Sequence, residues 1–131
     1  AREYYSERVR KRVERWLGDI SSEQDTIIKN WANEWVNTNP DWHQYQKNTY
    51  QAVSDLVEKK VDLPFVQVTT MQLLLNNESY YPDTLPDKLQ KNSAISAKYL
   101  MLIAQSSSEN QWQYFMDELG TLKSTLIDLQ K

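Results

Sequence analysis

Breaks in this chain are rare, and that constrains its fold more than any other feature. Only two glycines and four prolines occur in 131 residues, so the segments between them are long. Long segments with few turn residues are typical of helices, whereas sheet proteins need many short turns. We therefore expect an all-α fold, a single-domain bundle of about six helices over residues 1–131.

Two short motifs mark helix starts. Ser21-Ser22-Glu23-Gln24 and Ser108-Glu109-Asn110-Gln111 both read Ser-x-x-Gln, and each opens a long segment with helical apolar spacing. In such a capping box the serine hydroxyl accepts from an amide of the first turn, and the glutamine side chain reaches back to the serine amide. The motifs predict architecture rather than chemistry, and their recurrence hints at a weak internal repeat.

The apolar spacing predicts helices over about residues 3–17, 22–37, 42–60, 64–76, 86–105 and 109–130. Gly18 ends the first helix, Ser21 caps the second and Asp41 caps the third. Pro64 suits the first turn of the fourth, although the β-branched residues there leave a strand as the competing interpretation.

Two of these helices carry apolar residues that we expect to face a core. In the fourth they are Phe65, Val68, Met71, Leu74 and Leu75. In the last they are Trp112, Phe115, Leu119, Leu122, Leu126 and Leu129, whose alternating steps of three and four follow a coiled-coil seam. We expect this long helix to pack along much of the domain, with Gly120 at a close contact or a small kink.

Aromatic residues are abundant, with five tryptophans and eight tyrosines. Trp16, Trp31, Trp35 and Trp112 fall on apolar stripes, which favours core packing. The longest irregular connection, residues 77–86, is expected to be an exposed loop bearing Tyr80 and Tyr81. These two tyrosines, together with Trp42, are candidates for a contact surface.

Charge is unevenly distributed along the chain. Residues 1–17 hold six basic and three acidic side chains, so their net charge is +3 and the remainder carries −6 of the formal −3 total. Arg8, Arg12 and Arg15 are candidate contact residues, and the alternative is a solvated face of an amphipathic helix. The acidic body, with a pI near 5.2, argues against nucleic-acid binding.

No residue pattern points to catalysis, a cofactor or a metal. The chain has no cysteine, and a lone His43 cannot form a histidine metal cluster. Glu78, Asp83 and Asp87 lack the alternation of a calcium loop, so solvation is the expectation. Asn77-Glu78-Ser79 matches the glycosylation triplet, which is common by chance. No run of about 18 apolar residues is present, so no membrane-spanning helix is expected.

The order of elements resembles the C-terminal half of an uncharacterised family of Gram-negative lipoproteins. The resemblance lies in Trp16-Leu17-Gly18 at the end of one helix, followed by Ile20-Ser21-Ser22-Glu23-Gln24 where that family has a Leu-Thr-x-x-Gln start. It implies a periplasmic location and a lipid-modified cysteine upstream of Ala1, so that the chain is the C-terminal part of a longer precursor. It implies no reaction and no catalytic residues.

A more distant similarity is to small periplasmic helical chaperones of the Spy and CpxP type, which share the repeated Leu-Thr-x-x-Gln helix starts. We therefore expect a non-enzymatic domain of a periplasmic lipoprotein that acts through protein contacts at the cell envelope, tethered only by a lipid outside these residues. The alternative is an ATP-independent chaperone or stress-sensing binder, and a remote alternative is a hydrolase of envelope polymers. No cofactor is expected.

Overall fold

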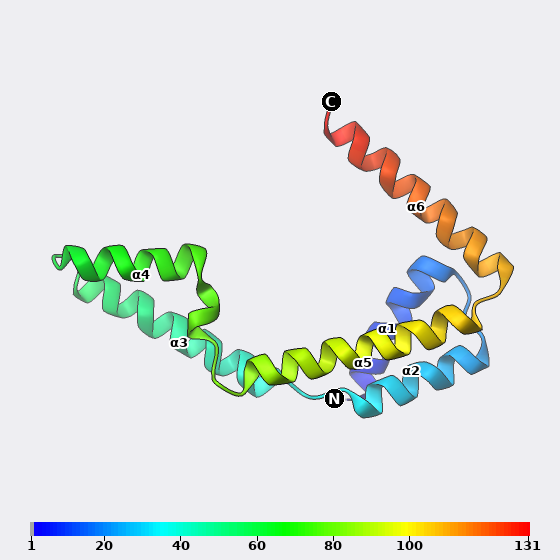
Figure 1. The fold of residues 1–131 in the computed structure, drawn as a ribbon, viewed down its shortest axis with the longest axis horizontal. Coiled ribbons are helices and arrows are strands. Elements are labelled where there is room, and N and C mark those ends of the chain that lie inside the picture. The colour runs from blue at the N-terminus through cyan, green and yellow to red at the C-terminus, as the bar shows by residue number, and fades with distance from the viewer. Residues whose placement is uncertain (1) are drawn as a thin grey trace. The chain divides into compact units, whose positions relative to one another are not determined.

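The protein folds entirely as helices, as the computed structural model of residues 2–131 shows (Figure 1). The elements are α1 (Arg2–Leu17), α2 (Ser22–Glu34), α3 (Asn39–Glu58), α4 (Leu63–Leu75), the short 3-10 turn η1 (Asn77–Tyr80), α5 (Leu85–Ser106) and α6 (Glu109–Leu129). The expectation of an all-α chain of about six helices with a long last helix is confirmed. The fourth segment, for which a strand was the competing interpretation, is the helix α4.

Contacts divide the chain into two compact units. One contains the chain up to Trp35 together with Ser93–Lys131, and the other contains Val36–Asn92. Helix α5 therefore contributes its first part to the second unit and the remainder to the first. Each unit is described by itself, and the single domain over residues 1–131 stays a prediction.

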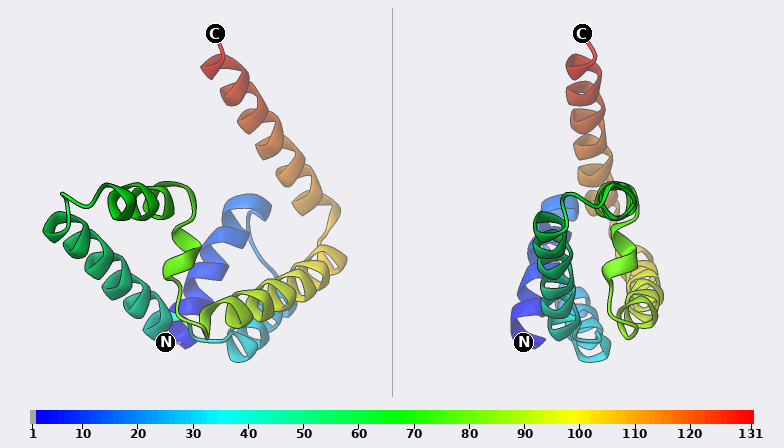
Figure 2. Two further views of the ribbon diagram at one scale, coloured as in Figure 1. Left: turned by 60° about the vertical axis from the view of Figure 1, so that its left-hand side comes forward. Right: turned by 90° about the vertical axis from the view of Figure 1, so that its left-hand side faces the viewer.

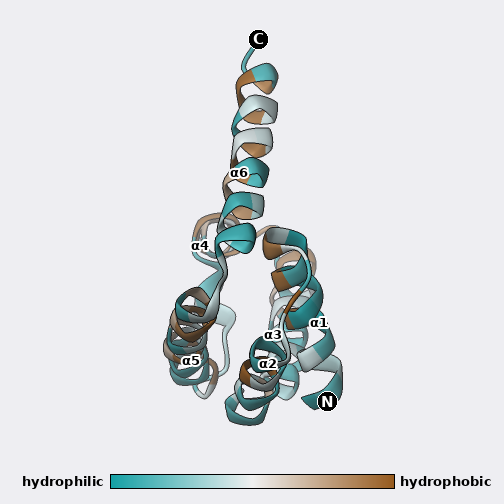
Figure 3. Cartoon of the chain, turned by 90° about the vertical axis from the view of Figure 1, so that its right-hand side faces the viewer, coloured by the Kyte–Doolittle hydropathy of each residue, from teal (hydrophilic) through white to brown (hydrophobic). Residues whose placement is uncertain are grey.

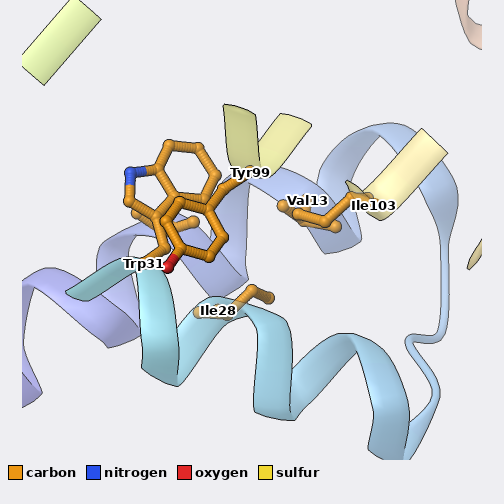
Figure 4. Close-up of a cluster of buried hydrophobic side chains, with 6 residues drawn as sticks. Val13, Ile28, Trp31, Tyr99 and Ile103 are labelled. Atoms are coloured by element: carbon orange, nitrogen blue, oxygen red, sulfur yellow. The ribbon is translucent and has the colours of Figure 1, made fainter. Parts of the chain in front are cut away.

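The core of the first unit is built by three helices. Val9 and Val13 of α1, Ile28 and Trp31 of α2, and Tyr99 and Ile103 of α5 form one buried cluster. The rings of Trp31 and Tyr99 stack with their centroids 6.1 Å apart and their planes 8° apart (Figure 4). Burying side chains of this size stabilises the fold by roughly 1.5–3 kcal/mol each, so this cluster is a main source of the unit's stability.

Gly18 ends α1 in the left-handed conformation that favours glycine, with φ of +77°. A Cβ at this position would lie 3.4 Å from the ring of Tyr114 on α6. The glycine therefore ends the helix as predicted, and the Tyr114 ring of α6 lies close to it.

Both predicted capping boxes form. The Ser21 and Ser108 hydroxyls accept from the amides of Gln24 and Gln111, at 3.1 and 3.2 Å. The glutamine Oε1 atoms in turn accept from the amides of Ser21 and Ser108, each at 2.9 Å.

The two capping glutamines also bind each other, although they lie 87 residues apart. Gln24 Nε2 donates to Gln111 Oε1 at 3.0 Å, and Gln111 Nε2 donates to Gln24 Oε1 at 2.7 Å. Gln111 Nε2 also donates to the Asp19 carbonyl at 2.9 Å. Gln24 is fully buried and Gln111 is 8% exposed. This reciprocal amide pair therefore joins the start of α2 to the start of α6.

Two helix boundaries differ from the prediction by three residues, and one long-range contact explains the first. Helix α2 ends at Glu34 instead of continuing to residue 37. The Asn92 side chain pairs with both the amide and the carbonyl of Val36, each at 2.9 Å, which satisfies this backbone without helical bonds.

Asp41 is not the cap of α3, which begins at Asn39 with Pro40 in its first turn. Its side chain is buried and accepts hydrogen bonds from the Thr84 hydroxyl and from Lys88 Nζ, the latter at 2.8 Å. Asp41 therefore joins α3 to the start of α5.

In the second unit α3 and α4 lie side by side as a helical hairpin (Figure 1). Asp62 caps α4 by accepting from the Phe65 amide at 3.2 Å. The expectation that the apolar set of α4 faces a core is wrong, because Val68, Met71, Leu74 and Leu75 are exposed and Phe65 is half-buried. Thr69 is the buried residue of α4. The exposed side of this helix carries the apolar residues just named and is therefore strongly apolar.

The prediction that α6 packs along much of the domain is also wrong. Its N-terminal half contacts α1 through the Trp16 and Phe115 rings, 6.0 Å apart, and the Arg15 to Glu118 ion pair at 2.6 Å. Beyond Glu118 the helix extends away from α1, α2 and the α5 segment of its unit (Figure 2). A Cβ at Gly120 would meet no atom within 4 Å, so no close contact explains this glycine.

We expect the Gln24 to Gln111 pair to be strongly coupled in stability. Gln24→Met and Gln111→Met should each cost about 2–4 kcal/mol, because each leaves buried amide groups and a helix-start amide unpaired. The double variant should cost at least about 1 kcal/mol less than the sum, as for residues in direct contact. Chemical denaturation monitored by circular dichroism measures all three.

Gln113→Met is the matched control for this cycle, because Gln113 is exposed on the same helix and bonds only to Asp117 nearby. Its effect should stay within about 0.5 kcal/mol. Purely additive costs for Gln24→Met and Gln111→Met would contradict a shared hydrogen-bonded pair.

Asp41 should make the free energy of unfolding depend on pH in the acid range. The hydrogen bonds from Lys88 and Thr84 hold the pKa of Asp41 below its usual value. Since the folded state lowers this pKa, the stabilisation is fully present above the unfolded pKa of about 3.9 and is lost as the pH falls through the folded value. Asp41→Asn should therefore lower the melting temperature at neutral pH and flatten its decline below about pH 4.

Thermal unfolding followed by circular dichroism from neutral to strongly acid pH measures this effect. Asp83→Asn, at an exposed position three residues beyond η1, is the control and should keep the wild-type decline. An Asp41→Asn profile parallel to that of the wild type would show that this carboxylate does not contribute.

Candidate functional site

An apolar concave feature lies within the first unit. It is a groove of about 560 Å³, in the size range of small-molecule and peptide sites, lined by side chains of α1, α2, α5 and α6. Its apolar lining consists of Val9, Val13, Leu17, Trp16, Trp31, Leu100, Ile103, Ala104, Trp112 and Phe115. An apolar groove of this size would lose contact with water on binding an apolar partner, which is favourable.

Two arginines line this groove without an acidic partner. Arg8 and Arg12 lie four residues apart, one turn of α1, and in residues 2–131 no carboxylate is within 4.0 Å of either guanidinium. Arg8 lies 5.8 Å from the ring centroid of Tyr4. The groove therefore combines an apolar floor with two positive charges that have no acidic partner among residues 2–131.

Two other basic residues of α1, Arg10 and Arg15, do have acidic partners. Arg10 pairs with Glu7 and with Asp25 of α2, where its Nε lies 2.9 Å from Asp25 Oδ1. Together with Lys29, this arginine holds the pKa of Asp25 below its usual value. Arg15, a predicted contact residue, is instead paired with Glu118 and lies over the Trp16 ring. Arg15 therefore connects α1 to α6 through an ion pair.

One buried polar group in the groove has no partner. Trp31 is 6% exposed, lines the groove, and its indole Nε1 makes no hydrogen bond within residues 2–131. Buried indole N–H groups usually find an acceptor. Trp112, which was expected in the core, is 44% exposed and forms a wall of the same groove.

The other predicted contact residues belong to the second unit. Trp42 and Tyr81 pack edge to face with each other and with Tyr45, with ring centroids 5.1–5.7 Å apart. The expectation that Tyr80 and Tyr81 are exposed is wrong, since both are half-buried. Tyr80 donates to Gln72 Oε1 at 3.1 Å, and its carbonyl accepts from Asn48 at 2.8 Å. These aromatic side chains hold α3, α4 and the 77–86 connection together.

Of the six predicted contact residues, the structure brings Arg8 and Arg12 together in the groove. Sequence reasoning missed the part of the lining that α5 supplies through Ser96, Leu100 and Ala104. The small residues of α5 were expected to admit a neighbouring helix, and that was the available signal. At Leu100, which is 53% exposed, the wall is open to solvent.

The described residues offer no cluster suited to metal chemistry. Within residues 2–131 no group of three or more His, Asp or Glu side chains is placed to hold a metal ion. His43 is exposed on α3, and Glu78, Asp83 and Asp87 are exposed around the start of α5. Within the same residues no helix is both long and apolar enough to cross a bilayer.

Comparisons of the chain with protein-family models, with curated proteins and with solved structures find no match.

Proposed function

We propose that this chain is a non-enzymatic helical binding domain that acts through protein contacts. The groove between α1 and α5 is its binding surface, and the preferred partner is an apolar polypeptide segment that carries carboxylates. The observation that carries this proposal is the pair of unpaired arginines, Arg8 and Arg12, beside an apolar floor.

The spacing of the arginines defines the partner further. Because they are one helical turn apart, two acidic residues four apart on a helical segment match them. The guanidinium group favours bidentate hydrogen bonds to carboxylates. Trp112 and Leu100 at the open side supply the apolar contact area that such a segment needs.

We place this domain in the periplasm as part of a lipoprotein. The support is the resemblance of Trp16-Leu17-Gly18 and the following Ser21 to Gln24 start to the lipoprotein family described above. The tether in that arrangement is a lipid outside residues 1–131, and the domain itself is left free to contact proteins at the envelope.

Synthetic amphipathic peptides test the groove. Two peptides share one apolar stripe and carry either a Glu pair or a Lys pair four residues apart. The Glu peptide should bind and change the fluorescence of the groove tryptophans, and the Lys peptide should not. In Arg8→Gln/Arg12→Gln the affinity for the Glu peptide should fall at least about tenfold, since charge-assisted hydrogen bonds are lost.

Arg2→Gln/Lys11→Gln is the matched control, because it removes the same charge from exposed positions of α1 outside the groove. Its affinity should stay close to that of the wild type. If both double variants weakened binding equally, the affinity would depend only on long-range charge and not on the two groove arginines. If the Glu peptide did not bind the wild type, the proposal would be wrong.

A second candidate, an ATP-independent chaperone, is favoured by the outward face of α4. Val68, Met71, Leu74 and Leu75 are 58–78% exposed there, and an apolar patch of this kind attracts apolar segments of unfolded chains. In an aggregation assay with an unfolded client, the protein at several-fold molar excess should suppress light scattering. Leu74→Gln/Leu75→Gln should reduce that suppression without unfolding the protein.

Gln67→Ala, on the same exposed face of α4, serves as the control for this assay and should retain full suppression. Absence of protection by the wild type at that excess would exclude the chaperone function.

A further inference from the structure

The distal half of α6 carries an apolar seam that nothing in its own unit covers. Leu119, Leu122, Leu126 and Leu129 are 37%, 42%, 52% and 78% exposed, so exposure rises toward the end of the helix. Figure 3 shows apolar residues recurring along this helix as it extends from the other helices of its unit. The solvated face of a helix is normally polar, so a line of four exposed leucines indicates a contact surface.

The spacing of the seam indicates what covers it. Steps of three and four give an average repeat of 3.5 residues, which keeps one line of side chains facing a partner helix over its whole length. Trp112 and Phe115 begin the same line, and Phe115 already packs on Trp16 of α1. The seam therefore continues the side of α6 on which Phe115 contacts α1, and its spacing suits pairing with a second helix.

The charges beside the seam indicate which helix pairs with it and in which orientation. Glu118 and Lys123 flank the leucines on opposite sides and are five residues apart. When two copies of α6 pair in parallel, Glu118 of each copy meets Lys123 of the other, which gives two attractive contacts. In an antiparallel pair that aligns the leucines, Lys123 of one copy faces Lys123 of the other, which is repulsive.

We propose that the occupant is a second copy of this chain, and that two copies pair in parallel through Leu119–Leu129 of α6. Glu118 remains able to take part, because its bond to Arg15 uses Oε2 and its side chain is 25% exposed. The pairing rests on α6 alone and does not depend on the groove or its ligand.

Sedimentation analysis of the full chain over a wide range of concentration gives the oligomeric state. The wild type should form dimers, and Leu122→Gln/Leu126→Gln should stay monomeric with unchanged helix content, because both leucines are already exposed in the single chain. Lys123→Glu should weaken the dimer at least about fivefold, since both attractive contacts become repulsive. Lys131→Glu, two residues beyond the predicted contact, is the matched charge control and should leave the dimer unchanged.

Disulfide cross-linking fixes the orientation, because the natural chain has no cysteine. Leu129→Cys should cross-link efficiently between two copies, since only parallel pairing brings the two positions within the roughly 7 Å that a disulfide spans. Cross-linking of Leu119→Cys to Leu129→Cys in a mixture, without Leu129 homodimers, would show antiparallel pairing and overturn the proposal. A monomeric wild type would overturn it too, as would dimers lost on Leu74→Gln/Leu75→Gln, which would show that α4 is the surface that α6 covers.

Discussion

The hydrogen-bonded pair of Gln24 and Gln111 is the interaction on which the first unit depends. Each glutamine caps its own helix, and the same two side chains then join the two helix starts to each other and to the Asp19 carbonyl. Both amide groups are buried, so an arrangement that separated them would leave several polar atoms without partners. A local capping device is therefore also a long-range tie, and it sets where α6 begins.

That tie has consequences for both proposed surfaces. It places the first turns of α6 beside α1, where Trp112 and Phe115 line the same groove as Arg8 and Arg12. The Arg15 to Glu118 ion pair joins α1 to α6, and beyond it the leucines of α6 are exposed in the part of this unit that the structure describes. One half of α6 thus builds a binding groove while the other half is left as an apolar seam. This arrangement supports the proposal that the chain acts through protein contacts.

Much of the fold could be predicted because its signals are local. Gly18, the two Ser-x-x-Gln motifs and Pro64 mark helix ends and starts through the chemistry of their own neighbourhood, and each lies where it was expected. The end of α2 could not be predicted, because the Asn92 side chain that satisfies Val36 lies 56 residues further along the chain. Asp41 looked like a cap for the same reason, since its partners Thr84 and Lys88 are equally remote. Periodicity located the apolar faces of α4 and α6, but it cannot tell whether a second surface covers them. Of the candidate site, the basic side of the groove was predictable from α1, and the α5 wall was not.

The most direct test of the central claim is to follow the side-chain amides of the glutamines by NMR. If Gln24 and Gln111 tie the helix starts together, their amide protons should exchange slowly with solvent and show cross-peaks to each other, while the amide of exposed Gln113 exchanges rapidly. Replacement of Gln24 by methionine should remove this protection at Gln111, because the two side-chain amides protect each other. Rapid exchange at both buried positions, with no contact between their amides, would contradict it.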